Sequence, residues 1–293
     1  MGIKPIITLL RPIQWVKNTV IFGALVFSRE FTNIDHVLTT LLAFCSFCLL
    51  SSAIYVVNDI ADRENDRLHP LKKLRPLAAG QISVSTAIAL AVLLAVIGAG
   101  VSLFLPLNFL FFVVAFLVLN LAYSWALKRI VIIDVMAIAA SFVIRAAAGA
   151  AAIAVPYSSW LIACTFLLAL FIGFGKRRHE LVTLKGDAVG HRSTLSQYSP
   201  YFLDQLIGVV TASTVVAYTF YTLSPDVKTK LGVERLELTI PFVLYGIFRY
   251  LYLIHQEERG GSPTQLLVSD VPLLLNIALW FLAVLAIFLF YSN

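Results

Sequence analysis

Charged residues are scarce in this 293-residue chain, because Asp, Glu, Lys and Arg together make up only 13% of it. A soluble domain needs more charge on its surface, and about a quarter of an average chain is charged. Hydrophobic residues make up 60% of the sequence, and the mean hydropathy is +0.89. This composition excludes a soluble hydrolase, a nucleic-acid reader and a disordered scaffold, and it indicates a membrane protein.

Cysteine is also rare, and Cys45, Cys48 and Cys164 all lie inside apolar runs. This placement excludes a disulfide framework and gives no support to a thiolate metal site. The first ten residues lack the long apolar core and cleavage site of a secretory signal, so we expect no cleaved leader. No GxSxG elbow, Walker loop, GxGxxG fingerprint or HExxH pair occurs, so acyl transfer, nucleotide hydrolysis and a zinc site have no support.

Long apolar runs dominate what remains. A helix that crosses a bilayer needs about 20 mainly apolar residues, and eight segments come close to this: Val37–Val57, Ser83–Leu105, Asn108–Leu127, Ile132–Ala154, Ser159–Gly175, Tyr201–Leu223, Leu238–Ile254 and Val271–Tyr291. A ninth, Trp15–Phe31, is shorter and contains Lys17 and Asn18. The sequence therefore predicts an all-α, polytopic membrane protein with about nine transmembrane helices in one bundle, and with residues 1–293 as a single domain.

Lys and Arg are concentrated on alternate loops. If nine helices are numbered in order, most Lys and Arg residues lie in the N-terminal stretch and in the loops that follow even-numbered helices. The opposite loops carry only Arg29, Lys228, Lys230 and Arg235. The positive-inside rule places the basic loops in the cytoplasm. This asymmetry also explains the net charge of +6 without a nucleic-acid partner. We expect a multi-pass protein of the cytoplasmic (inner) membrane, with a cytoplasmic N-terminus and its polar site on the cytoplasmic side.

The strongest chemical signal begins where the second predicted helix ends. Asn58, Asp62 and Asp66 recur at intervals of four residues, and Asp59 lies three residues before Asp62. A helix that continued through this stretch would place all of these oxygen-bearing side chains along one stripe. Hard oxygen ligands with open positions suit Mg²⁺ that is shared with the phosphates of a substrate. The alternative is an ordinary solvated helix end, where Arg63 and Arg67 neutralise the acids.

A basic stretch follows the acids directly. Lys72, Lys73 and Arg75 supply cationic donors for phosphate oxygens that a metal would not reach. The alternative is a juxtamembrane basic run that contacts anionic lipid, which explains the cations but not the adjacent acids. Together, the acidic and basic stretches predict a site for a diphosphate group.

Arg145 is another charged residue that needs an explanation. It lies near the middle of a predicted helix, in a run of alanine and glycine. An ionised group at this depth is costly and usually lines a cavity or a pathway. The alternative is a structural ion pair. Tyr55, one turn before Asp59, is a candidate site residue or an interfacial aromatic residue.

Several motifs together resemble one family. Asn58-Asp59-x-x-Asp62-x-x-x-Asp66, the Lys-x-x-Arg-Pro-Leu-Ala-Ala-Gly stretch from Lys72, and Tyr123-Ser124-x-x-Leu127-Lys128 resemble the UbiA superfamily of intramembrane prenyltransferases. Within it, the stretches Arg11–Asn18, Gly175–Leu181 and Ser262–Asp270 look like the decaprenyl-phosphate phosphoribosyltransferase branch. The resemblance covers nearly the whole chain. It implies an Mg²⁺-dependent enzyme with Asn58 and Asp62 as metal ligands and with Asp59, Asp62 and Asp66 as catalytic carboxylates.

One departure from the wider superfamily narrows the expected chemistry. Where prenyl-diphosphate users carry a second aspartate-rich motif, this chain has Gly175–Glu180, with Asp187 isolated further on. One acidic patch with extra cations suits one metal-bound diphosphate plus further phosphates held directly by Lys and Arg. The expected substrates are phosphoribosyl pyrophosphate and a membrane-embedded polyprenyl phosphate. The cations left to hold the ribose 5-phosphate and the lipid phosphate are Lys17, Lys128, Arg145, Lys176 and Arg177.

The expected reaction is phosphoribosyl transfer to the polyprenyl phosphate, an early step towards a lipid-linked pentose for cell-envelope glycans. An aromatic prenyltransferase of the quinone-precursor type is the alternative enzyme, and the missing second acidic motif argues against it. A transporter would also explain a buried arginine. It would not explain the compact acidic stretch followed by cations. Homo-oligomerisation stays open at this level.

Overall fold

The computed structural model describes residues 3–68, 72–183, 194–257 and 259–291, and their regular structure is helical. The predicted Asp187 and part of the basic loop that contains it lie outside these residues. Contacts between residues divide the chain into two compact units. The first contains residues 1–26, 30–137 and 141–157, and the second contains residues 27–29, 138–140 and 158–293. Each unit is described by itself below.

Eight helices in the described part of the chain are long and apolar enough to cross a bilayer. They are α3 (Ile34–Ala61), α5 (Val84–Ser102), α6 (Leu107–Trp125), α7 (Ile133–Ala152), α8 (Ser159–Thr183), α10 (Pro200–Leu223), α12 (Ile240–His255) with the 3₁₀ turn η6 (Leu236–Thr239) before it, and α14 (Val271–Phe290). These helices confirm the eight apolar segments predicted as spans and the all-α fold class.

The predicted ninth span is not one continuous α-helix. A short helix α1 (Ile3–Leu10) is followed by the 3₁₀ helix η1 (Pro12–Ile21) and by α2 (Phe22–Phe27). The chain turns at Arg11, which has a φ of 53°, and Pro12 then starts η1. Because a 3₁₀ helix rises about 2 Å per residue, η1 and α2 together are about 29 Å long. This segment therefore reaches about the length of a bilayer core, although it has few residues.

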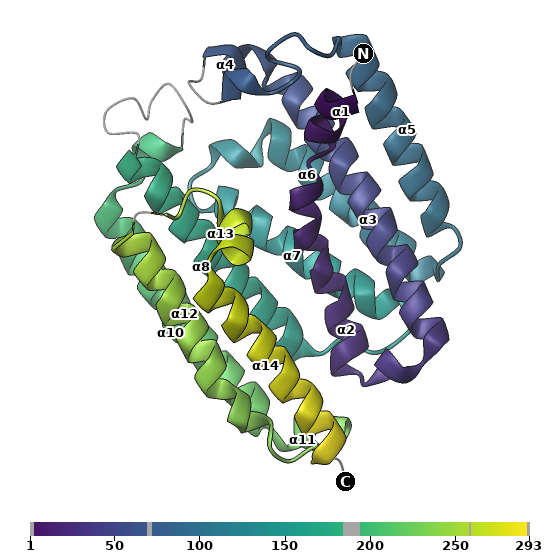
Figure 1. Ribbon diagram of the computed structural model, residues 1–293, viewed down its shortest axis with the longest axis vertical. Coiled ribbons are helices and arrows are strands. Elements are labelled where there is room, and N and C mark those ends of the chain that lie inside the picture. Colours follow the sequence, from purple (N-terminus) through teal and green to yellow (C-terminus); the bar gives the residue numbers. More distant parts are fainter. Residues whose placement is uncertain (1–2, 69–71, 184–193, 258, 292–293) are drawn as a thin grey trace. The chain divides into compact units, whose positions relative to one another are not determined.

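Helix α3 is the centre of the first unit (Figure 1), and α5 packs along much of its length. Gly98 permits the close approach, because a Cβ atom there would lie 2.9 Å from Leu50 Cγ. Ser46 on α3 donates a hydrogen bond to the Gly98 carbonyl at 2.9 Å. On another side of α3, the Phe47 ring lies 5.7 Å from Phe109 and 5.0 Å from Phe116 of α6. Close van der Waals packing and buried hydrogen bonds of this kind stabilise helix contacts in lipid.

The end of η1 packs on α7 in the same unit. A Cβ atom on Gly149 would lie 2.1 Å from the Ile21 carbonyl oxygen, so only glycine fits this contact. The alanines that surround Gly149 are buried and equally small. This contact brings the polar side chains of η1 to the helices that carry the candidate site.

The second unit contains α8, α10, α12 and α14, together with the short helices α11 (Pro225–Leu231) and α13 (Pro263–Ser269). Helix α10 packs along α8, and α12 packs against α14. Trp280 on α14 donates a hydrogen bond to the Tyr218 hydroxyl at 2.9 Å. That hydroxyl also lies 2.7 Å from Thr239 Oγ1, so Tyr218 links α10 to α14 and to η6.

Candidate functional site

The acidic stretch lies at the end of α3 but does not continue as one helix. Helix α3 ends at Ala61, Asp62 has φ −95° and ψ 5°, and the short helix α4 begins at Arg63 and ends at Leu68. The predicted single stripe of four oxygen-bearing side chains is therefore wrong. Their contacts divide them into two pairs, because Asp59 and Asp66 share an arginine, whereas Asn58 and Asp62 contact other residues.

The first pair, Asp59 and Asp66, is buried and shares one arginine. The two residues are 3% and 4% exposed. Arg75 Nη1 lies 3.2 Å from Asp59 Oδ1 and 2.6 Å from Asp66 Oδ2. Arg75 directly follows the 3₁₀ turn η3 (Lys72–Leu74), which contains the two predicted lysines. The arginine predicted to bind phosphate thus contacts two of the acids predicted as catalytic carboxylates.

Arg11 is a second partner of Asp59, and it was missing from the predicted site. Its Nη2 group forms an ion pair with Asp59 Oδ1, and its guanidinium carbon lies 5.3 Å from the centre of the Tyr55 ring. The sequence carried one signal at Arg11, because this residue begins the Arg11–Asn18 stretch that resembles the family branch. No local pattern pairs Arg11 with a residue 48 positions away, so the contact with Asp59 was not predicted.

The second pair, Asn58 and Asp62, faces α6 and the 3₁₀ turn η4 (Leu127–Arg129). Ser124 donates a hydrogen bond to the Asn58 amide oxygen. Lys128 Nζ lies 2.9 Å from Asp62 Oδ1, and the Asp62 side chain is 36% exposed. The partners of the two contacts are equally spaced in the sequence, because Asp62 lies four positions after Asn58 and Lys128 lies four positions after Ser124. The structure therefore brings Lys128 to the acidic stretch, as the predicted site requires.

Lys17 and Tyr55 lie next to each other one turn below Asp59. Lys17 Nζ donates to the Tyr55 hydroxyl at 3.5 Å, and both side chains are half-buried. The neighbouring Trp15 donates to Ser52 Oγ at 3.0 Å, which fixes η1 on α3. Lys17 is thus a second cation beside Tyr55, after Arg11, and its side chain faces α3.

Arg145 lies deeper, in a network of neutral groups. It is 4% exposed, and its Nε donates to Asn18 Oδ1 at 2.8 Å. Its Nη1 donates to the Ser141 carbonyl at 2.9 Å and to the Ser141 hydroxyl at 2.8 Å. The rings of Phe116 and Phe142 lie 4.6 Å and 5.3 Å from the guanidinium carbon.

No acid within the described ranges forms an ion pair with Arg145. The alternative that Arg145 belongs to a structural ion pair is therefore contradicted there. A buried cation that is balanced only by dipoles and aromatic rings is costly. Its surroundings therefore favour an anion, which a phosphate group would supply.

Two further predicted residues lie beside Arg75. Lys72 is half-buried and Lys73 is exposed, and both belong to η3. The Arg75 amide donates to the Lys72 carbonyl at 2.9 Å, so the three cations share one tight turn. This turn therefore places the predicted basic stretch next to the buried acids of α3 and α4.

Lys176 and Arg177 belong to the second unit and form a cluster with Glu180. Arg177 is 1% exposed, and its Nη1 lies 2.5 Å from Glu180 Oε2. Lys176 Nζ lies 3.7 Å from Glu180 Oε1, and its side chain is 42% exposed. One turn on, the Gly260 amide donates to His179 Nδ1 at 3.2 Å, which holds the loop after α12 against α8.

The burial of Arg177 gives a test that separates it from Lys176. Arg177→Ala removes a buried partner of Glu180, so we expect the free energy of unfolding to fall by about 1.5–3 kcal/mol. Lys176→Ala removes an exposed side chain and should change it by less than about 0.5 kcal/mol. Denaturation of the two purified variants in detergent measures this difference. Equal stabilities would show that Arg177 does not contribute through its burial.

The Ser262–Asp270 stretch is anchored by an ion pair. Arg249 Nε and Nη2 contact the two oxygens of Asp270 at 3.1 and 2.7 Å. Asp270 also accepts from the Leu273 amide at 3.0 Å and so caps α14. The hydrogen bond from Arg249 is the main cause that lowers the pKa of the Asp270 carboxyl group below its ordinary value. This residue is therefore a structural anchor for α13 and α14.

The donor groups at the end of α3 fit Mg²⁺ by their chemistry. Within the part of the chain that the structure describes, no three His, Cys, Asp or Glu side chains converge on one point. Protein Mg²⁺ sites usually need only one or two carboxylates, because waters and substrate phosphates supply the remaining oxygens. Asn58 and Asp62 offer one amide and one partly exposed carboxylate oxygen. Asp59 and Asp66 are already occupied by arginines.

Comparisons with known proteins identify related sequences. The model of the UbiA prenyltransferase family matches residues 18–266. The chain is 30% identical over 289 residues to a decaprenyl-phosphate phosphoribosyltransferase of Mycolicibacterium smegmatis, and the match covers 95% of this chain and 90% of that relative. A decaprenyl-phosphate phosphoribosyltransferase of Corynebacterium glutamicum is also 30% identical, with 96% of this chain and 86% of the relative covered.

A solved structure supports the fold. A UbiA homologue from Archaeoglobus fulgidus bound to GPP and Mg²⁺ has a TM-score of 0.72 to this chain. The match covers 97% of this chain and 99% of that one, at 19% sequence identity. At this identity the likeness shows a shared fold, and the ligands belong to that homologue.

Proposed function

The chain belongs to the UbiA prenyltransferase family and is an integral membrane transferase, and from that premise we propose that it carries out phosphoribosyl transfer. It moves the 5-phosphoribosyl group of phosphoribosyl pyrophosphate to a polyprenyl phosphate of the decaprenyl type and releases pyrophosphate. The names of the two relatives support phosphoribosyl transfer and decaprenyl phosphate as the acceptor. The product suits an early step towards a polyprenyl-phosphate-linked pentose for the cell envelope.

One structural observation carries the proposal. The first unit gathers five cations at and below the end of α3: Arg11, Lys17, Arg75, Lys128 and Arg145. A single diphosphate does not require so many. Phosphoribosyl pyrophosphate and a lipid phosphate together bring a diphosphate and two further phosphates, and Lys and Arg bind such groups through charge-assisted hydrogen bonds.

In this reaction the bond between ribose C1 and the pyrophosphate oxygen breaks, and an oxygen of the lipid phosphate bonds to C1. The acceptor is already an anion at neutral pH, so it needs no strong general base. Orientation and charge stabilisation then account for most of the rate. This explains why the site is rich in cations and why no histidine is among the contacts that hold the acids in the part of the chain that the structure describes.

Asn58 and Asp62 are the residues that would hold Mg²⁺, which stabilises negative charge on the departing pyrophosphate. Lys72, Lys73 and Arg75 share one tight turn at the same end of α3 and would bind the same leaving group. Asp59 and Asp66 hold Arg75 in place, and Asp59 also holds Arg11. We therefore propose that Asp62 is the carboxylate closest to the reacting groups and that Asp59 and Asp66 are positioning residues.

The remaining cations would hold the other phosphates. Lys17 and Arg145, with Tyr55 of α3, would bind a second phosphate, and Lys128, which contacts Asp62, would bind a phosphate near that carboxylate. Lys176 and Arg177 of α8 are assigned to the same substrates by their resemblance to family positions. We place the site on the cytoplasmic side of the inner membrane because the basic loops favour that orientation.

A direct transfer assay tests the proposal. Purified protein in detergent is incubated with Mg²⁺, polyprenyl phosphate and phosphoribosyl pyrophosphate labelled in its ribose. We expect the label to enter the lipid phase and pyrophosphate to be released in equal amount. Excess EDTA should stop both. If no label enters the lipid, and a prenyl diphosphate instead alkylates a hydroxybenzoate, the chain is an aromatic prenyltransferase and the proposal is wrong.

A further inference from the structure

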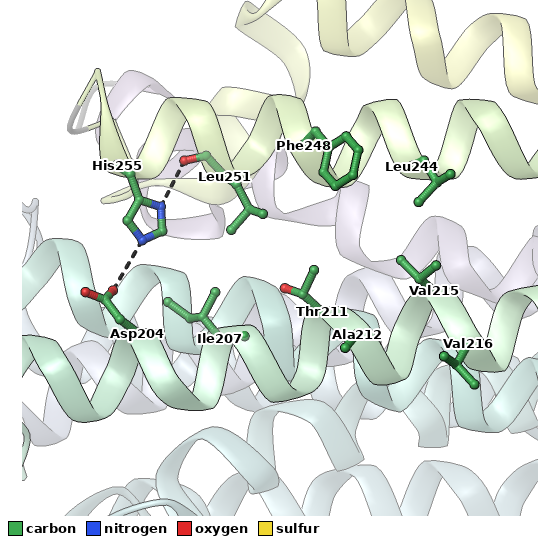
Figure 2. A pocket seen from close by; sticks show the side chains of 11 residues that line it. Asp204, Ile207, Thr211, Ala212, Val215, Val216, Leu244, Phe248, Leu251 and His255 are labelled. Atoms are coloured by element: carbon green, nitrogen blue, oxygen red, sulfur yellow. Dashed lines mark hydrogen bonds and ion pairs between the residues drawn. The ribbon is translucent and has the colours of Figure 1, made fainter.

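A groove in the second unit has no part in the proposed reaction. It runs between α10 and α12 and has a volume of about 490 Å³ (Figure 2). Its sides are apolar, with Ile207, Gly208 and Ala212 on α10 and Leu244, Phe248 and Leu251 on α12. Phe248 is 59% exposed at its edge, so the groove is open to the surroundings of the helices.

One end of the groove is polar. His255 Nε2 lies 3.2 Å from Asp204 Oδ1, and His255 Nδ1 lies 3.0 Å from the Leu251 carbonyl oxygen (Figure 2). Arg178 Nε on α8 donates to the same Asp204 oxygen at 2.5 Å. The Arg178 terminal nitrogens form no hydrogen bond within the described residues. Two amino groups of a guanidinium are thus available at the mouth of an apolar groove.

The contacts also indicate which groups this end can bind. Both ring nitrogens of His255 lie within hydrogen-bond distance of oxygen atoms, Asp204 Oδ1 and the Leu251 carbonyl. The terminal nitrogens of Arg178 lie at the same end, and guanidinium groups bind phosphate through charge-assisted hydrogen bonds. This end of the groove therefore suits a phosphate group of a lipid.

The length of the groove indicates which lipid. Asp204 and Val216 mark its ends on α10, and twelve residues of α-helix rise about 18 Å. One leaflet of a bilayer core is about 15 Å deep, which is half of the full thickness. The groove is therefore as long as one acyl chain in one leaflet, and it is too short for a long polyprenyl chain.

We propose that this groove binds one acyl chain of an anionic phospholipid, whose phosphate contacts Arg178 and His255. The site is separate from the residues assigned to phosphoribosyl transfer, and it does not depend on that assignment. The lipid covers apolar side chains between α10 and α12 and joins the polar ends of α8, α10 and α12. Protein purified in mild detergent should therefore retain this lipid.

Filling the groove tests the occupant. A Cβ atom at Gly208 would meet nothing within 4 Å, so Gly208→Leu should fill the groove without a clash. Gly100 on α5 is equally open, and Gly100→Leu is the matched control. After reconstitution into vesicles of phosphatidylglycerol and phosphatidylcholine and gentle re-extraction, native mass spectrometry counts the bound lipids. We expect one bound phosphatidylglycerol per chain in the wild type. Its occupancy should fall at least about fivefold in Gly208→Leu and stay unchanged in Gly100→Leu.

Two charge variants test the polar end. Arg178→Gln should lower the preference for phosphatidylglycerol over phosphatidylcholine by about fivefold. Asp204→Asn removes the competing acid and should keep or raise that preference, which a purely structural ion pair would not do. Equal binding of both lipids by wild type, unchanged binding by Gly208→Leu, or a polyprenyl phosphate as the retained lipid would each overturn the proposal.

Discussion

Asp62→Asn is expected to abolish transfer while the protein stays folded. The substitution keeps the size of the side chain but removes the one partly exposed carboxylate at the end of α3 that could bind Mg²⁺. Loss of a metal contact in the transition state costs several kcal/mol, and about 4 kcal/mol corresponds to roughly a 10³-fold lower kcat/KM. The transfer assay with labelled phosphoribosyl pyrophosphate measures this loss.

Asp35→Asn is the matched control, because Asp35 is exposed in the first turn of the same helix. It should retain wild-type activity. Both variants should unfold at the wild-type temperature in detergent, since neither residue is packed in the core. Activity of Asp62→Asn within twofold of wild type would contradict its role as a metal ligand.

Arg145→Met is expected to remove most activity and to preserve stability. The guanidinium is buried among neutral groups and has no acidic partner within the described residues. Replacement of a buried charge by an apolar side chain of similar length is often neutral or stabilising. If Arg145 binds a substrate phosphate, its loss should lower kcat/KM by about 10² to 10³, as removal of a single preorganised donor does.

The control for Arg145 is Arg249, which lies on the membrane helix α12. Arg249→Met breaks the ion pair with Asp270, so it should lower the unfolding temperature, and it removes no residue of the proposed site. We expect the two variants to differ in both measurements. Arg145→Met should be as stable as wild type but inactive, whereas Arg249→Met should be less stable. An unstable Arg145→Met variant that regains activity at low temperature would show that Arg145 serves the fold.

Particular residues show how far the sequence predicted the site. The spacing of Asn58 and Asp62, with Lys128 at a distance in sequence, predicted a metal and phosphate cluster, and the structure joins Lys128 to Asp62. Their chemical roles stay predictions. The continued helix was wrong, because it breaks at Asp62. Arg11 was missed, since its contact with Asp59 requires the chain to turn back at a residue with positive φ.

The chain's hydropathy by itself determined the all-helical class and eight apolar spans. Apolar length is a local property, and each helix satisfies its own backbone hydrogen bonds in lipid. Only the tertiary structure decided which acids share an arginine and which face a lysine. Those contacts join residues far apart in sequence, such as Asp59 with Arg11 and Asp62 with Lys128. They depend on how η1, α3 and α6 pack, and no local pattern encodes that.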